Sequence, residues 1–177
     1  MTSAEHKVAA GERAVPTAVI TCSDSRTEAT DVSGGRIKAL LAERGHPVVF
    51  YAISPDEPGK IRALLTELVG RGDVRAIILN GGTGVSPRDN TFDAVAGMMS
   101  KTLPGFGELF RMLSYQAVGS AAMLSRAVAG IIVPPPPAVG EPKIVFSIPG
   151  SPNAVEVAMG QLILPELSHL AWETTRT

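Results

Sequence analysis

The chain has 177 residues and a formal net charge of -1, with 45% hydrophobic, 19% charged and 5% aromatic residues. This length is that of one ordinary domain with a sizeable core, and the single cysteine, Cys22, excludes a disulfide framework and a cysteine-rich zinc module. The balance of charges argues against a nucleic-acid-binding protein, and the scarcity of aromatic residues leaves little for base stacking.

The first residues carry Glu5 and Glu12 and have no sustained apolar run before Val15, which is typical neither of a secretory signal nor of a membrane anchor. Elsewhere the apolar runs are much shorter than the roughly 20 residues of a transmembrane helix. We therefore expect a cytoplasmic protein with no membrane partner. Residues 1–13 are expected to form a flexible polar lead, and residues 14–177 a single domain.

Four short, continuous aliphatic runs predict strands that are buried on both faces of a parallel sheet. Amphipathic helical patterns follow the first two runs and end at Gly45 and Gly70. This alternation predicts an α/β fold, a doubly wound and mostly parallel sheet flanked by helices. The predicted strands are Thr17–Thr21, Pro47–Ile53, Arg75–Leu79 and Lys143–Ile148.

The later part of the chain is predicted to be largely helical. Residues from Thr91 to Gly130 are rich in Ala, Met and Leu, with a break at Leu103–Gly105. Pro134–Pro137 predicts a stiff, extended connector into the last strand. A final helix follows Pro152, and we expect Pro165 to kink it.

A small, polar or glycine-rich segment follows each predicted strand. Ligands of doubly wound sheets bind outside the carboxyl ends of the strands, where the strand order reverses. The four segments together therefore predict a ligand site at this edge of the sheet. They are Ser23–Arg26, Ser54–Glu57, Asn80–Gly84 and Pro149–Pro152.

The segment Gly81–Gly84 has three glycines in four residues, which lets backbone N–H groups approach an anion closely. It lacks the Gly-Lys-Ser/Thr ending of a P-loop and the glycine spacing of the dinucleotide fingerprint. A phosphate-binding loop and a simple flexible turn therefore both remain open. Arg88 and Asp89 follow, a guanidinium suited to phosphate and a carboxylate suited to a metal ion.

Three carboxylates, those of Asp24, Asp56 and Asp89, lie on these segments. Each has a structural alternative: an Asx turn for Asp24, the N-cap of the following helix for Asp56, and the cap of a helix that opens near Thr91 for Asp89. As a set they are typical of a metal–nucleotide site, since Mg²⁺ takes one or two carboxylates together with substrate phosphates.

The next motif leaves the choice between structure and function open. Ser125 and Arg126 are predicted to lie in an apolar helix, where they either pack or meet a ligand phosphate. Cys22, at the end of a strand with no histidine nearby in the sequence, is expected in the core rather than as a nucleophile.

The motifs, taken in order, resemble those of the MoaB/Mog family, the molybdopterin-binding and molybdopterin adenylyltransferase proteins of molybdenum cofactor synthesis. The resemblance covers roughly Ala14 to Ala171, and the run Gly105–Ser114 is more similar to the MoaB branch. The motifs that carry it are Gly81–Gly84, Ser86–Asp89, Pro104–Glu108, Leu124–Ala127 and Pro149–Pro152.

The resemblance implies a nucleotidyltransferase that adenylylates molybdopterin with ATP and Mg²⁺ and releases pyrophosphate. It implies that Asp56 and Asp89 are the catalytic and magnesium-binding pair. The alternative is a carrier of the same pathway that binds molybdopterin without turnover, because some MoaB-branch members have no established activity. The substrate-binding positions that the resemblance implies are Asp24, Gly81, Gly82, Thr83, Gly84, Arg88, Ser125, Arg126, Pro149, Gly150 and Ser151.

The family also implies an assembly of identical subunits, a trimer or, in the MoaB branch, a hexamer. The Ala- and Met-rich stretch from Ala94 to Met123 supplies apolar surface for such an interface. Other proteins of molybdenum cofactor synthesis are expected as further partners.

Overall fold

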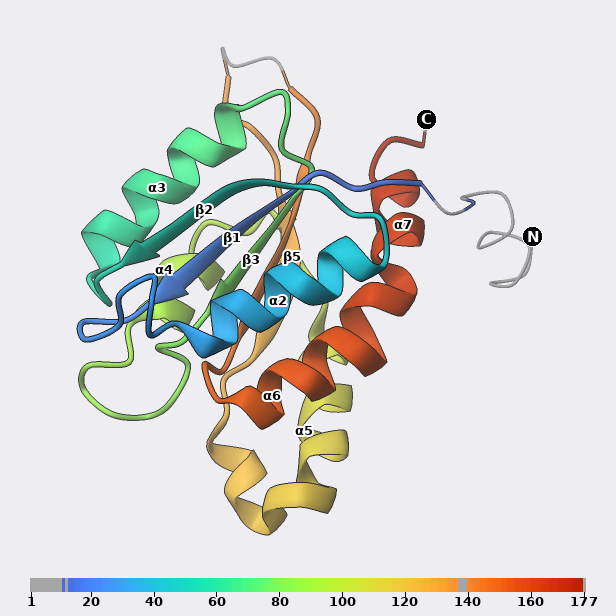
Figure 1. The fold of residues 1–177 in the computed structure, drawn as a ribbon. Helices are drawn as coiled ribbons and strands as arrows, with labels where there is room; N and C mark the ends of the chain where they lie inside the picture. Colours follow the sequence, from blue (N-terminus) through green and yellow to red (C-terminus); the bar gives the residue numbers. More distant parts are fainter. Residues whose placement is uncertain (1–10, 12, 137–139, 177) are drawn as a thin grey trace.

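The computed structural model describes residue 11 and residues 13–136 and 140–176 (Figure 1). Most of the predicted polar lead and the last proline of the predicted connector, Pro137, lie outside the described residues. Six strands form one sheet in the order β2-β1-β3-β6-β5-β4. Their bounds are Thr17–Cys22 (β1), Val48–Ser54 (β2), Ala76–Asn80 (β3), Lys101–Thr102 (β4), Val128–Ile132 (β5) and Lys143–Ile148 (β6).

The four predicted strands are β1, β2, β3 and β6, and they pair in parallel. The two remaining strands, β5 and β4, pair antiparallel at one edge. The fold is thus the mostly parallel α/β sheet that the sequence predicts. The prediction that the helical region extends to Gly130 is wrong, because the aliphatic segment Val128–Ile132 pairs with β6 and buries Ala129 and Ile131.

Helices cover both faces of the sheet (Figure 1). One core packs α2, α5 and the C-terminal helices against one face, with Phe110 and Phe146 among its largest buried side chains. The other core packs α3 and α4 against the opposite face. The helices are α2 (Val32–Glu43), α3 (Pro58–Gly70), α4 (Thr91–Ala96), α5 (Pro104–Val118), α6 (Pro152–Val157) and α7 (Leu164–Glu173), with a 3₁₀ helix at Gly119–Leu124 and a π-helix at Ala158–Ile163.

The C-terminal helical run changes direction between α6 and α7, as Pro165 predicts (Figure 1). Proline has no N–H to donate, so the regular helical ladder is interrupted near it. The π-helix directly precedes α7, and such a wider turn absorbs this kind of interruption. In the described part of the chain, no helix is both long enough and apolar enough to cross a membrane.

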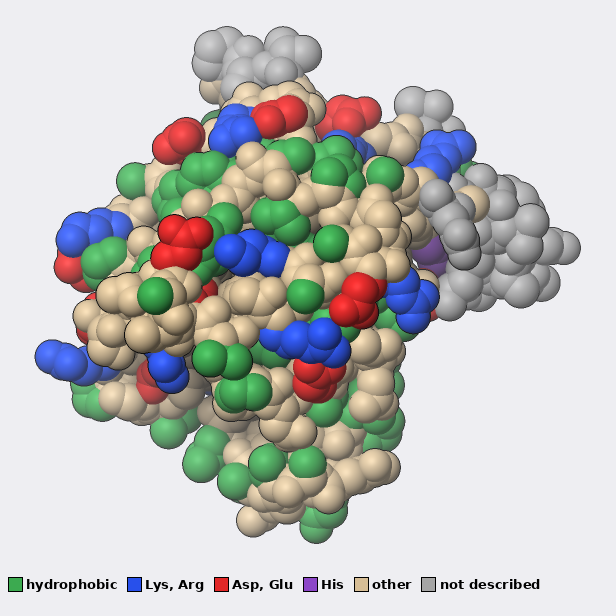
Figure 2. Space-filling model, viewed as in Figure 1, with side chains coloured by type: hydrophobic (Ala, Val, Ile, Leu, Met, Phe, Trp, Pro, Cys, Tyr) green, Lys and Arg blue, Asp and Glu red, His purple; other side chains and the backbone are tan. Residues whose placement is uncertain are grey.

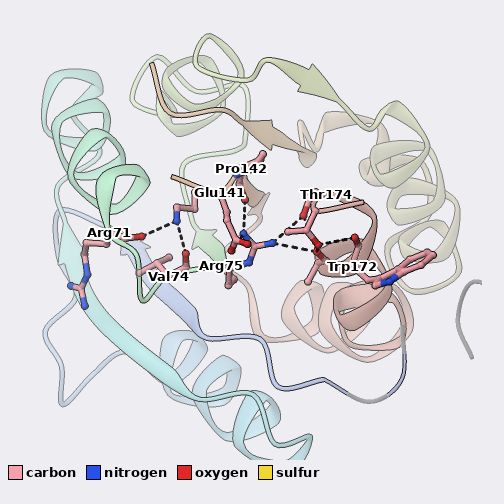
Figure 3. Close-up of polar contacts among 10 residues, drawn as sticks. Arg71, Val74, Arg75, Glu141, Pro142, Trp172 and Thr174 are labelled. Atoms are coloured by element: carbon pink, nitrogen blue, oxygen red, sulfur yellow. Dashed lines mark hydrogen bonds and ion pairs between the residues drawn. The ribbon is translucent and has the colours of Figure 1, made fainter. Parts of the chain in front are cut away.

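Two basic side chains fix the amino-terminal edge of the sheet (Figure 3). The buried Lys143 donates from Nζ to the carbonyl oxygens of Arg71 and Val74, each at 2.7 Å. Arg75, directly before β3, donates to the carbonyl of Ala171 at 3.2 Å and so joins β3 to α7. Arg75 also forms an ion pair with Glu141. Burial lowers the pKa of Lys143. These contacts hold the amino-terminal ends of the strands together, at the end of the molecule opposite the predicted loops.

His46 makes stability depend on pH. Its Nδ1 accepts the amide of Val15 at 3.1 Å, which requires the neutral ring, and burial followed by the charge of Arg44 lowers its pKa. Below the ordinary value of 6.5 the unfolded chain therefore binds more protons than the folded one. We expect the free energy of unfolding to fall by up to about 1.4 kcal/mol per pH unit from this group as the pH drops below 6.5.

Denaturant unfolding of the parent and of His46→Asn between pH 5 and pH 8 tests this expectation. Asn keeps an acceptor for the Val15 amide but does not titrate. The difference in stability between the two proteins should shift in favour of the variant as the pH falls. Parallel curves over the whole range would show that His46 does not carry the effect.

Candidate functional site

The strand order reverses between β1 and β3, because the chain leaves β1 for one neighbour, β2, and later returns on the other side. A cavity of about 220 Å³ lies at this point, outside the carboxyl ends of the strands. Three of the four predicted segments line it, those that follow β1, β3 and β6, whereas the segment after β2, Ser54–Glu57, does not. Its lining includes Ser23, Arg26, Ser33, Gly81, Gly150 and Pro152. A hollow of about 750 Å³ beside His46 lies at the opposite end of the strands, away from these segments.

A buried hydrogen-bond network forms one wall of this cavity. Asp31 Oδ2 accepts Thr21 Oγ1 at 2.5 Å and Tyr51 O–H at 2.6 Å, while Oδ1 accepts the amide of Gly34 and caps α2. Burial works to raise the pKa of Asp31, but these hydrogen bonds hold it below its ordinary value. Asn80 donates to Thr21 Oγ1 at 2.8 Å. Among the described residues, its own buried Oδ1 has no partner.

Asp31 is not among the predicted site residues, although the sequence carries a signal for it. An Asp directly before the apolar pattern of a helix is a typical N-cap. Its contact with Tyr51 on β2 depends on how β1 and β2 are placed beside α2, which the sequence pattern does not reveal.

Asp56 joins two loops at the carboxyl edge. Its Oδ1 accepts the amide of Asn90 at 3.2 Å and Thr91 Oγ1 at 3.0 Å, at the start of α4. The alternative that Asp56 caps its own helix is wrong, because Glu57 is the N-cap of α3. Burial raises the pKa of Asp56, the two hydrogen bonds oppose this, and the nearby carboxylates of Asp89 and Asp24 raise it further.

Asp24 and Asp89 lie near Asp56, and the three carboxylates form an acidic group. Asp24 Oδ1 accepts the amide of Asp56 at 3.1 Å, whereas Ser23 Oγ accepts the local turn amides. Asp89 Oδ2 accepts the amide of Ser86 at 2.9 Å, and Asn90 is the N-cap of α4. Asp24 therefore links two loops instead of forming an Asx turn, and Asp89 closes its own loop instead of capping α4. The structure brings all three predicted carboxylates together.

The glycine-rich loop lies against this acidic group because it lacks side chains. Gly81 has φ +106° and Gly82 has φ +59°. A Cβ at Gly81 would lie 2.2 Å from the carbonyl oxygen of Cys22, and a Cβ at Gly82 would lie 2.2 Å from Asp56 Oδ2. A Cβ at Gly84 would lie 2.8 Å from Asp89 Oδ2. Anion binding by this loop stays a prediction.

Ser125 and Arg126 lie in extended chain after the 3₁₀ helix, so their predicted helical setting is wrong. Ser125 lines a groove of about 370 Å³ together with Phe92 and Arg111. Arg126 also lines this groove, but its guanidinium donates to the carbonyl oxygens of Gly84 and Asp89.

The remaining predicted positions have defined surroundings. Arg88 is exposed, and the buried Thr83 accepts the amide of Arg126 through its carbonyl oxygen. Pro149 directly follows β6, the Gly150 carbonyl accepts Ser33 Oγ at 2.8 Å, and Ser151 Oγ caps α6.

Cys22 is buried at the end of β1, as expected. Burial raises the pKa of its thiol to about 12. A thiol that stays protonated at neutral pH is a poor nucleophile, so the core interpretation holds.

The residues present fit Mg²⁺ that is bound mainly through substrate. Among the described residues, no three His, Cys, Asp or Glu side chains form a metal-binding cluster. Mg²⁺ needs only one or two carboxylates when phosphates and water supply the other ligands. The hydrogen bonds described for Asp56 use Oδ1, and its Oδ2 lies against Gly82 in the glycine-rich loop.

Comparison with known proteins places the chain among related sequences and structures. Residues 18–169 match the family described as "Probable molybdopterin binding domain". Molybdenum cofactor biosynthesis protein B of Bacillus anthracis is 46% identical over 177 residues, which cover 99% of each chain. A crystal structure of a molybdenum cofactor biosynthesis protein B matches with a TM-score of 0.86 and 43% identity, over 94% of this chain and 99% of the other. The tungsten cofactor synthesizing protein MoaB from Pyrococcus furiosus matches with a TM-score of 0.80 and 34% identity, over 93% and 99%.

Proposed function

Since the chain belongs to the MoaB/Mog family of molybdenum cofactor biosynthesis proteins, on its MoaB branch, we propose that it adenylylates molybdopterin with ATP and Mg²⁺. One observation carries the proposal. Two carboxylates from separate loops, Asp56 and Asp89, converge on the glycine-rich loop at the edge where the strand order reverses.

The proposed reaction joins an oxygen of the molybdopterin phosphate to the α-phosphorus of ATP, and the bond from that phosphorus to the bridging oxygen breaks, so that pyrophosphate leaves. Transfer of this kind depends on positioning and charge neutralisation. Mg²⁺, when bound, supplies charge neutralisation for the phosphates. Asp56 and Asp89 would hold it, and Asp24 orients the Asp56 loop through the Asp56 amide. The attacking phosphate is already ionised at pH 7, so no general base is needed.

The glycine-rich loop supports the same proposal from the backbone side. Gly81–Gly84 offers main-chain atoms at close range where a side chain would collide with Cys22 or with the acidic pair. Ser125, which lines the groove beside Phe92, and Gly150, which lines the cavity at the carboxyl edge, are proposed to contact substrate. Arg88, Pro149 and Ser151 are proposed as further substrate contacts.

The test is an assay of purified protein with molybdopterin, ATP and Mg²⁺ that measures pyrophosphate. Stoichiometric molybdopterin binding without pyrophosphate would identify the chain as a carrier. Pyrophosphate formed only when both substrates are present supports the transferase.

We also propose that the chain forms a homo-oligomer. Figure 2 shows hydrophobic side chains on the lower part of the molecule, where α5 and the 3₁₀ helix lie. Met112, Tyr115 and Met123 are 59%, 62% and 76% exposed there. Exposed apolar side chains grouped in this way are typical of an interface.

Light scattering at micromolar concentration is expected to give a mass that is a multiple of the monomer mass. Met123→Lys should lower that mass, because it places a charge in the apolar face. Ala63→Lys, on the exposed side of α3 across the sheet, is the matched control and should leave the mass unchanged. A monomeric parent would contradict the proposal.

A further inference from the structure

We infer, on the basis of the proposed function, that Arg126 is a positioning residue for Asp89. It acts by holding both ends of the loop Gly84–Asp89, not by contacting a substrate phosphate. Arg126 thereby has a role other than the substrate contact that the family resemblance implies.

One guanidinium grips both ends of the loop. Arg126 Nε donates to the carbonyl oxygen of Gly84 at 2.8 Å, and Nη2 donates to the carbonyl oxygen of Asp89 at 2.5 Å. Nη1 pairs with Asp93 Oδ2 on α4 at 2.9 Å. The Arg126 amide donates to the Thr83 carbonyl at 3.0 Å. Three of the five guanidinium N–H groups donate to protein, and the two carbonyls occupy the Nε/Nη2 edge that could otherwise bind a phosphate bidentately.

The guanidinium plane is also held by a ring. Its carbon lies 4.8 Å from the ring centroid of Phe92, and the Phe92 amide donates to the carbonyl of Gly82. Arginine suits this setting, because its flat, delocalised group stacks on the ring while its edge donates in the plane. The hydrogen bond from the Phe92 amide to Gly82 also joins the glycine-rich loop to α4.

These contacts determine where the Asp89 carboxylate lies. The Asp89 carbonyl is held by Arg126, its amide donates to the Ser86 carbonyl, and its Oδ2 accepts the Ser86 amide. The carboxylate thereby lies close against Gly84, whose own carbonyl Arg126 also holds. Without Arg126 the local turn could persist, but both ends of the loop would be free to shift. A displacement of about 1 Å at a reacting centre can lower a rate a hundredfold.

Arg126→Lys separates positioning from charge. Lysine keeps the positive charge but cannot donate in one plane to two carbonyls and a carboxylate. We expect kcat for pyrophosphate release to fall about tenfold or more, with the KM for ATP changed less than about threefold. A phosphate contact would instead show a raised KM and be largely rescued by lysine. Arg62→Lys, on the exposed face of α3, is the matched control and should behave like the parent.

A double-mutant cycle tests whether Arg126 acts through Asp89. In an Asp89→Asn background, Arg126→Lys should cost less than about threefold in kcat, because the carboxylate it positions has lost its charge. If the two losses multiply in full, Arg126 acts independently of Asp89 and the inference is wrong.

Hydrogen exchange supplies a readout that does not depend on catalysis. Arg126→Lys should speed exchange of the Ser86 and Asp89 amides about tenfold or more, whereas Arg62→Lys should leave both unchanged. If Arg126→Lys does not fold, Asp93→Asn weakens one of the three side-chain contacts and should speed exchange at the same amides by a smaller factor. A parent that releases no pyrophosphate would overturn the proposed function, while unchanged exchange at these amides would overturn the role of Arg126.

Discussion

Asp89→Asn is expected to lower the rate of pyrophosphate release about a hundredfold or more and to leave molybdopterin binding intact. The amide keeps the size of the side chain and an oxygen that accepts the Ser86 amide, so the loop should hold its shape. The lost charge is the one that would hold Mg²⁺ against the triphosphate. A hundredfold corresponds to about 2.7 kcal/mol of transition-state stabilisation. Steady-state kinetics and a molybdopterin titration measure the two quantities.

Asp73→Asn is the matched control for this change. Asp73 is an exposed carboxylate paired with Arg71 at the opposite edge of the sheet, so its variant should keep full turnover. Turnover by Asp89→Asn at the rate of the parent would mean that Asp89 is not part of the metal site.

Asp56→Asn is the stricter form of the same experiment, because Asp56 also ties two loops together. The Asn oxygen can still accept the Asn90 amide and the Thr91 hydroxyl. Burial raises the pKa of the carboxyl, so the charge itself opposes folding and its removal should not lower the melting temperature. A hundredfold loss of turnover at unchanged stability would identify Asp56 with the chemistry, and equal turnover would reject the acidic pair.

Gly81→Ala is expected to lower the free energy of unfolding by about 3 kcal/mol or more. It is also expected to abolish ligand binding at the cavity of about 220 Å³ where the strand order reverses. Its φ of +106° is strained for any residue with a Cβ. The new methyl would also lie 2.2 Å from the carbonyl oxygen of Cys22, which is backbone and has little freedom to move. Denaturant unfolding and a molybdopterin titration check the two effects.

Gly35→Ala provides the comparison for that variant. Gly35 lies inside α2, and a Cβ there meets nothing within 4 Å. Alanine should therefore stabilise the protein by up to about 1 kcal/mol through helix propensity. If both variants lost stability equally, the effect at Gly81 could not be assigned to the loop geometry.

The parallel strands could be predicted from sequence because each is a continuous aliphatic run. β6 has the predicted bounds, Lys143–Ile148, and β1 extends its prediction by Cys22 alone. β5 was missed because Val128–Ile132 follows a helix-rich segment without a turn signal, and its partner, β6, comes only after the proline connector. The two-residue β4 is too short for any periodicity to mark it.

For the candidate site, the positions of the loops could be predicted from the sequence, but the contacts of their side chains could not. The loops that carry Asp24, Asp56 and Asp89 could be placed at one edge, since parallel strands direct all their carboxyl ends there. What each carboxylate contacts could not be predicted. Asp56 binds Asn90, 34 residues away, and Arg126 reaches Gly84, 42 residues away. Such pairings follow from the packing of loops, for which local sequence carries no pattern.

The position of β6 bears on how the chain acquires its fold during synthesis. β6 pairs with β3 on one side and with β5 on the other, yet it comes after both of them in the chain. Until Lys143–Ile148 emerges, β2-β1-β3 and the β4–β5 pair are two fragments with no strand between them, and the apolar edge of β3 stays open. Unpaired apolar edges of this kind expose nascent chains to aggregation. The sheet can therefore close only after Lys143–Ile148 has been synthesised, and a chain that stops before residue 143 leaves the two fragments unjoined.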